Sequence, residues 1–187
     1  MFLRRTGARM KKNNLSLQIK EDILDWIVNV VEQKNTKLNN LPMCPYARQV
    51  RNDKRLRVVV NTEEEPLGFN YALEAYKYDP RKDVVIWANP KYKECQEKFH
   101  KFIDERNKEM VESDIWLMGF HPDDGEDADE FFYENMQTIP FDVDYTMVFI
   151  QSWKALKEAA KALDDLGYYD NWTVGYYRSV VEKRESY

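Results

Sequence analysis

Hydrophobic positions recur with a helical period near the start of the chain, between about residues 16 and 34. They fall three or four residues apart, at Ile19, Ile23, Trp26, Ile27, Val30 and Val31. This stripe predicts an amphipathic helix that begins with Ser16 as its N-cap and ends in the polar run 35–40. Residues 1–15 are expected to form a flexible basic tail, or residues 1–9 precede a true start at Met10. The tail also weakly resembles an organellar presequence.

Three short apolar runs predict β-strands at about residues 55–62, 83–89 and 114–120. Helical patterns over about 63–79 and 91–112 separate them. The second run is almost continuously hydrophobic, which is typical of a strand covered on both faces. This alternation predicts one α/β domain over residues 16–187. Its mainly parallel sheet of three to four strands, in a β-α-β-α-β order, is expected to be covered by helices, with an N-terminal helix and a helical C-terminal third.

The last third of the chain allows more than one interpretation. Residues 145–150 (YTMVFI) have high β-propensity, but their apolar positions continue a helical stripe into the segment that follows. We therefore expect one helix from about residue 142 to 166, ended by Gly167. Residues 172–181 alternate only in part, so an edge strand and a last helix both remain open.

Charge and cysteine content narrow the class of protein. The 187 residues carry a net charge of −5, but the first 20 hold six basic residues and no acidic one, which leaves about −11 for the remainder. Such an acidic body disfavours nucleic-acid binding outside the tail. No apolar run reaches the roughly 18–20 residues that span a bilayer. With Cys44 and Cys95 alone, we expect no disulfide scaffold and a reducing, cytoplasmic location.

Cys44 is the first candidate for chemistry. Pro42 and Pro45 stiffen its loop, and Arg48 and Arg51 follow. Nearby positive charge favours a thiolate, so we expect a lowered thiol pKa and a reactive side chain. A buried cysteine with a purely structural role is the alternative.

Polar residues also end each of the three predicted strands, at Asn61, Asn89 and His121. In parallel sheets, ligands bind outside the carboxyl ends of the strands. The leading hypothesis is therefore a site at this edge, with a thiol, an imidazole as its proton partner and an acid that orients the imidazole. These three are Cys44, His121 and Asp123, and a small anionic substrate would be bound by Arg48, Arg51, Asn61 and Asn89. The hypothesis requires that folding bring Cys44 to His121.

The other cysteine and the other histidine suggest no site. Cys95 falls on the apolar stripe of the helix expected over residues 91–112 and should be buried as a small hydrophobe. His100 lies among lysines on the opposite side, where we expect an exposed side chain.

Two other functions remain open. A non-catalytic interaction protein would dock a partner, or a second copy in a homo-oligomer, through its acidic or aromatic surface. A metal-dependent hydrolase would hold Mg²⁺ or Mn²⁺ on the acids of residues 123–130, which also fit a solvated turn. Two histidines and no CxxC disfavour zinc. With six glycines and no Gly-rich phosphate motif, no nucleotide cofactor is expected.

Two resemblances to known families involve the cysteine motif. Cys44-Pro45-Tyr46-Ala47 resembles the CPYC of glutaredoxins, but here a helix precedes the motif and a strand soon follows, so we take the likeness as coincidence. The same motif, then Phe120-His121-Pro122, then Ile139-Pro140-Phe141 resemble in their order an uncharacterised bacterial family, a domain of unknown function. An aromatic expected after FHP is replaced by Asp123 and Asp124, and a small-Pro-Tyr-Pro motif is reduced to Ile-Pro-Phe-Asp. The resemblance supports Cys44 and His121 as a place without naming a reaction.

Overall fold

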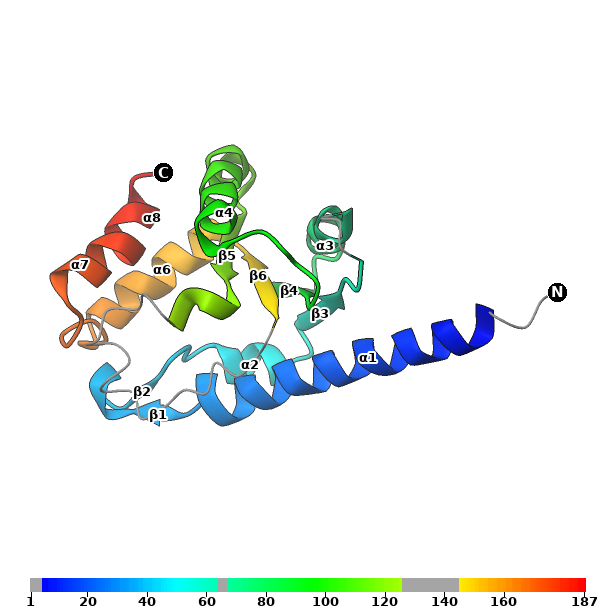
Figure 1. Ribbon diagram of the computed structural model, residues 1–187. Helices are drawn as coiled ribbons and strands as arrows, with labels where there is room; N and C mark the ends of the chain where they lie inside the picture. Colours follow the sequence, from blue (N-terminus) through cyan, green and yellow to red (C-terminus); the bar gives the residue numbers. More distant parts are fainter. Residues whose placement is uncertain (1–4, 64–66, 126–144) are drawn as a thin grey trace.

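A four-stranded mixed sheet lies at the centre of the computed structural model, which describes residues 5–63, 67–125 and 145–187 (Figure 1). Its strands run in the order β3 (Leu56–Val60), β4 (Val84–Asn89), β6 (Thr146–Gln151) and β5 (Trp116–Phe120). β3 pairs parallel with β4, whereas β6 is antiparallel to both β4 and β5. β3, β4 and β5 therefore point the same way. The predicted α/β class is confirmed, with a mixed pattern of strand pairing.

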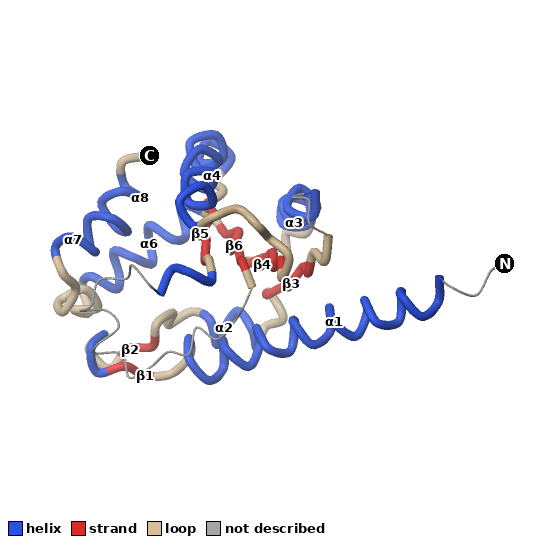
Figure 2. Tube along the Cα trace, viewed as in Figure 1, coloured by secondary structure: helices blue, strands red, loops and turns tan. Residues whose placement is uncertain are grey.

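The prediction of one helix over about residues 142–166 is wrong for residues 146–151. These form the inner strand β6 (Figure 2). A strand buried on both faces is apolar throughout, so its sequence satisfies a helical stripe as well as a β pattern. The helix begins only after Ser152, whose Oγ accepts a hydrogen bond of 3.1 Å from the Ala155 N–H. This helix, α6, spans Trp153–Asp164. Residues 142–144 lie outside the described part of the chain.

The two faces of the sheet are covered by different helices. Val85 and Trp87 on β4 face the core beneath α3 (Leu67–Tyr78) and α4 (Gln96–Met110). Ile86 and Ala88 face the opposite core, which includes α1 (Arg5–Trp26). This alternation follows from the period of two residues along a strand. Figure 1 shows α1 crossing below the sheet, with α3 and α4 above it.

α1 confirms the predicted stripe, since Ile19 and Ile23 are fully buried. It begins at Arg5, so the cap expected at Ser16 lies inside the helix, and residues 5–15 of the expected tail belong to it. A π-helical turn, Ile27–Val31, continues it. Next come the short antiparallel strands β1 (Lys34–Asn35) and β2 (Leu41–Pro42), separated by a 3₁₀ turn, Thr36–Leu38, and then the helix α2 (Ala47–Asn52).

α4 begins later than expected, at Gln96, because Asn89 folds the chain into a turn through a hydrogen bond to the Lys91 N–H. Cys95 is consequently the exposed N-cap residue rather than a buried one. Near the other end of α4, the buried Asn107 side chain bonds both the N–H and the C=O of Leu117, at 2.8 and 3.0 Å. This amide connects α4 to the edge strand β5.

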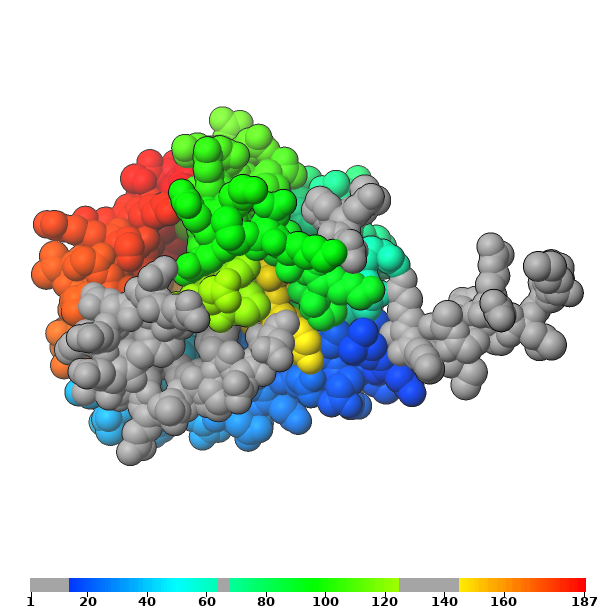
Figure 3. All heavy atoms as spheres, in the orientation of Figure 1, coloured from blue at the N-terminus to red at the C-terminus, as the bar shows by residue number. Residues whose placement is uncertain are grey.

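The C-terminal segment is helical, which settles the choice that the sequence left open. It comprises α7 (Val174–Tyr177), a π-helical turn (Arg178–Glu182) and α8 (Lys183–Glu185). Lys183 Nζ lies 2.6 Å from Asp104 Oδ2 on α4, and the Tyr187 ring lies 5.2 Å from that of Trp116. In Figure 3 this orange and red segment lies directly beside the green atoms of α4.

Candidate functional site

Cys44 lies in the loop between β2 and α2, where its N–H donates a hydrogen bond of 3.2 Å to the Val31 carbonyl. The residue is exposed at its outer side. The protein packed around the sulfur nevertheless raises the thiol pKa by desolvation, and the negative charge of Glu32 adds to the increase. Backbone hydrogen bonds from Tyr46 and Ala47 oppose it without reversing it. The thiol pKa therefore shifts in the direction opposite to the one expected from the sequence.

The two arginines expected to activate this thiol bind Glu32 instead. Arg51 contacts both carboxylate oxygens, and Arg48 donates to Oε2 at 3.4 Å and to the Glu32 carbonyl at 3.3 Å. The Glu32 side chain is only 2% exposed. Hydrogen bonds from Arg51 are the main reason that the pKa of Glu32 is lowered. The two arginines expected to stabilise a thiolate or bind a substrate are thus both engaged by Glu32, Arg51 more closely than Arg48.

His121 is held in the turn that follows β5. Its Nδ1 accepts a hydrogen bond of 3.2 Å from the Asp123 N–H, so the ring proton is assigned to Nε2, which lies 3.1 Å from the Glu94 carbonyl oxygen. The residue is 6% exposed, and its ring lies 5.8 Å from that of Phe99. The Asp123 carboxylate is 3.4 Å from Nδ1 but largely exposed. Both ring nitrogens therefore serve the fold of this turn.

The structure does not bring Cys44 and His121 together. The partner of Cys44, Val31, belongs to the core on the α1 face, whereas the partner of His121, Phe99, belongs to the core beneath α4. Within residues 5–63, 67–125 and 145–187, no hydrogen bond, ion pair or ring contact joins the two. These residues thus belong to opposite faces of the sheet.

Asn61 and Asn89 do lie at the carboxyl edge of the sheet, but their side chains end the strands. Asn61 Oδ1 accepts from the Glu63 N–H at 3.0 Å. Asn89 Oδ1 accepts from the Lys91 N–H at 2.8 Å, while its Nδ2 donates to the Glu63 carbonyl. Both residues are buried. Such Asx turns replace the missing strand partners of the backbone, which gives both amides a structural role.

Asp124, for which no individual role was predicted, joins the two histidines at this edge. Its Oδ1 lies 2.6 Å from His100 Nε2 and 3.2 Å from Gln96 Nε2, and its Oδ2 accepts from the His121 N–H at 2.7 Å. Burial favours a higher pKa, but the hydrogen bonds from His100, His121 and Gln96, together with the charge interaction with His100, outweigh it and lower the pKa of Asp124. The spacing of four residues between Gln96 and His100 placed both on one helix face, which was the available sequence signal.

The cation site expected over residues 123–130 is described only in part. Asp124 uses both carboxylate oxygens for the contacts above, and Asp123 is exposed. No group of three or more His, Cys, Asp or Glu in the described part of the chain is arranged to hold a metal ion. Residues 126–130 lie outside that part.

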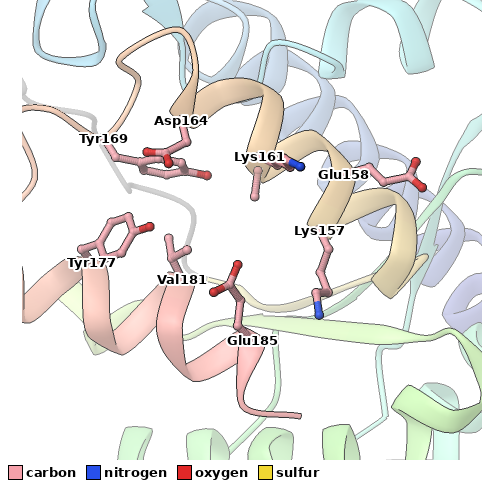
Figure 4. Close-up of a pocket in the computed structure, with 9 residues that line it drawn as sticks. Lys157, Glu158, Lys161, Asp164, Tyr169, Tyr177, Val181 and Glu185 are labelled. Atoms are coloured by element: carbon pink, nitrogen blue, oxygen red, sulfur yellow. The ribbon is translucent and has the colours of Figure 1, made fainter.

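A cavity of about 310 Å³ lies between α6 and the C-terminal helices (Figure 4). We call it the C-terminal cavity; its walls are Lys157, Glu158, Ala160, Lys161, Asp164, Tyr169, Tyr177, Val181 and Glu185. The rings of Tyr169 and Tyr177 meet edge to face, with centroids 5.5 Å apart. Figure 4 shows the Tyr169 hydroxyl pointing along α6 toward Lys161. The only sequence signal for this cavity was the concentration of aromatic residues between 168 and 177.

Beside this cavity, Arg184 is 6% exposed and pairs with no carboxylate among the described residues. Its Nε and Nη2 have no hydrogen-bond partner. Arg55 and Arg106 also have an unbonded Nε, but each holds a carboxylate through another nitrogen. The positive charge of Arg184 opposes the rise in the Tyr169 pKa that burial causes, so the guanidinium acts on that hydroxyl from close by. Arg184 is thus a buried cation linked to the cavity through a tyrosine.

Comparison with known proteins identifies no relative. Neither a protein-family model, nor a curated protein, nor a solved structure matches the chain. The motif at residues 139–141, one of three that carry the resemblance to the uncharacterised family, lies outside the described residues. Across the segments that the structure describes, no helix has both the length and the apolar character needed to cross a membrane.

Proposed function

We propose that this protein binds a small anionic ligand in the C-terminal cavity. The observation that carries the proposal is Arg184, a buried guanidinium that has no carboxylate partner in the described chain and two nitrogens without a hydrogen-bond acceptor. A buried charge without a partner is costly, and each buried polar group that lacks a partner calls for an explanation, such as a bound ion. Arg184 is not itself a wall of the cavity, but an anion beside Tyr169 would bring a negative charge close to it.

Tyr169 lies between Arg184 and the proposed ligand, and its hydroxyl would donate a hydrogen bond to that ligand. A guanidinium has no acceptor atom, so toward the nearby Arg184 the phenol oxygen of Tyr169 can only accept. The phenol hydrogen is then available to donate, and the neighbouring positive charge strengthens it as a donor. With the ammonium of Lys161 on the same wall, a carboxylate or phosphate would receive a hydrogen bond and a compensating charge. Ala160 and Val181 supply apolar contact for the rest of a ligand.

The proposal keeps the anionic ligand that the sequence suggested and moves its site. Arg51 is paired closely with Glu32, and Arg48 also contacts that carboxylate, so both arginines already have an internal partner. Arg184 has no such internal partner within the described residues. The proposal is one of binding and assigns no reaction.

Thermal unfolding tests the proposal. Sodium hexanoate or sodium phosphate, added at constant ionic strength against sodium chloride, should raise the unfolding midpoint of the wild-type protein, because a ligand that binds only the folded state stabilises it. The increase should disappear in Arg184→Met and persist in Arg178→Met, a control at an exposed arginine of the same helical segment. Tyr169→Phe, which removes only the hydroxyl, should reduce the increase in the unfolding midpoint. It replaces Arg184→Met as the test variant if Arg184→Met does not fold. No increase with either anion, or equal increases in Arg184→Met and wild type, would refute the proposal.

We also propose a cytoplasmic location and a distant relationship to the uncharacterised family. The first rests on two cysteines, both free thiols in this structure, and the second on the order of three short motifs. Imaging of a tagged chain tests the location. The structure of a family member tests the relationship. It should contain an inner strand that, like β6, lies between the equivalents of β4 and β5 and runs antiparallel to both.

A further inference from the structure

We infer that the ligand of the C-terminal cavity carries an ammonium group as well as an anionic group, as an amino acid does. This inference rests on the proposed function, because it concerns the same cavity. It begins with the charges on the walls, which include three carboxylates, Glu158, Asp164 and Glu185, and two lysines, Lys157 and Lys161.

None of these five side chains forms an ion pair with any residue that the structure describes. The Lys157 ammonium forms a cation–π contact, since its Nζ lies 4.5 Å from the centre of the Trp153 ring. The carboxylates therefore exceed the cations available on the walls. A ligand with only negative charge would be attracted by Lys161 and by the nearby charge of Arg184 but would be repelled by the acids. An ammonium on the same ligand removes that repulsion.

The charges are also unevenly distributed around the two tyrosines. At Tyr169 the strongest charge effect on the hydroxyl pKa comes from Arg184 and lowers it. At Tyr177 the strongest charge effects come from Asp164 and Glu185, and they add to burial in raising the pKa. Figure 4 shows Glu185 reaching from the C-terminal helices toward α6, into the space that Lys157 borders. An anionic group at Tyr169 and an ammonium beside Glu185 would match this distribution.

Isothermal titration with matched ligand pairs tests the inference. β-Alanine is compared with propionate, and γ-aminobutyrate with butyrate, at pH 7 and constant ionic strength. In at least one pair the amino compound should bind about tenfold more tightly, the change expected from one additional favourable charge contact. Glu185→Gln should abolish this advantage and leave binding of the plain carboxylate intact. Glu182→Gln, at an exposed acid one turn away, should keep it.

The outcomes separate the inference from the function on which it rests. If hexanoate, phosphate and all four compounds fail to bind, the anion site itself is refuted. If the plain carboxylates bind as tightly as the amino compounds, or if Glu185→Gln and Asp164→Asn both preserve the advantage, only the ammonium requirement is refuted. Asp164→Asn also replaces Glu185→Gln if that variant does not fold.

Discussion

Arg51 holds the buried carboxylate of Glu32 in a fork of two hydrogen bonds, 2.6 Å from Nε to Oε1 and 2.9 Å from Nη2 to Oε2. Glu32 follows the π-helical end of α1, and Arg51 belongs to α2, so the fork fixes the loop that contains Cys44 between these helices. Planar, charge-assisted pairs of this kind are stronger than single neutral hydrogen bonds. The same contact removes the charge that would have activated the cysteine.

Replacing Arg51 with methionine should destabilise the protein by about 3 kcal/mol, because it leaves the buried Glu32 carboxylate with only the weaker Arg48 contact. Chemical denaturation measures this loss. Arg81→Met is the matched control, since Arg81 is 83% exposed and pairs with Asp79 at the surface, where little stability should be lost. Equal losses in the two variants would show that the fork has no special role.

The contribution of Glu32 should depend on pH. Its pKa in the folded protein is lowered from the ordinary value of 4.5, so the ionised carboxylate stabilises the fold above that pH, and the contribution is lost as the pH falls through the lowered pKa. The unfolding free energies of wild type and Glu32→Gln should therefore converge below pH 4.5. Denaturation curves recorded between neutral and strongly acidic pH measure the difference, and a constant difference would contradict the prediction.

Cys44 should react as an unactivated thiol. Its raised pKa keeps the thiol protonated, so alkylation by iodoacetamide in a Cys95→Ser background should still accelerate above pH 8.5, roughly the pKa of an ordinary cysteine. Mass spectrometry follows the modified fraction at each pH. Unmodified protein from Cys44→Ser/Cys95→Ser confirms that the signal comes from cysteine. A rate that levels off well below pH 8.5 would restore the reactive-thiol hypothesis.

The Asn107 amide should be important for joining α4 to the edge strand. Asn107→Leu keeps the volume but leaves the N–H and C=O of Leu117 without this partner, which should cost about 2 kcal/mol. Thermal and chemical unfolding measure the loss. Asn70→Leu, at an exposed position on α3, should cost much less, and a comparable loss there would indicate a general effect of the substitution.

Asp124 should matter more than its neighbour Asp123. Asp124→Ala removes the contacts to His100, Gln96 and the His121 N–H and should destabilise the protein by about 1–2 kcal/mol. Asp123→Ala removes only a carboxylate that is 61% exposed, because the hydrogen bond to His121 Nδ1 comes from the Asp123 backbone. Unfolding free energies of the two variants should therefore differ clearly. A larger loss in Asp123→Ala would favour its originally expected role beside the imidazole.

The sequence by itself determined the features that depend on local periodicity. The stripe through Ile19 and Ile23, the outer strands β3 and β5, and the positions of Asn61 and Asn89 at the carboxyl edge all follow from patterns within a few residues. Each such pattern depends on the geometry of one helix or strand, which is the same in any fold.

Only the tertiary structure decided which of these elements meet. β6 was misread because an apolar run that is buried on both faces fits either period, and the partners that make it a strand are far away in the chain. Arg48 and Arg51 lie near Cys44 in the sequence, but their positions did not reveal that both would bind Glu32. Arg184 beside Tyr169, and Cys44 apart from His121, depend on how helices pack on the two faces of the sheet. Such contacts are set by the burial of whole faces, which short spacings in a sequence do not encode.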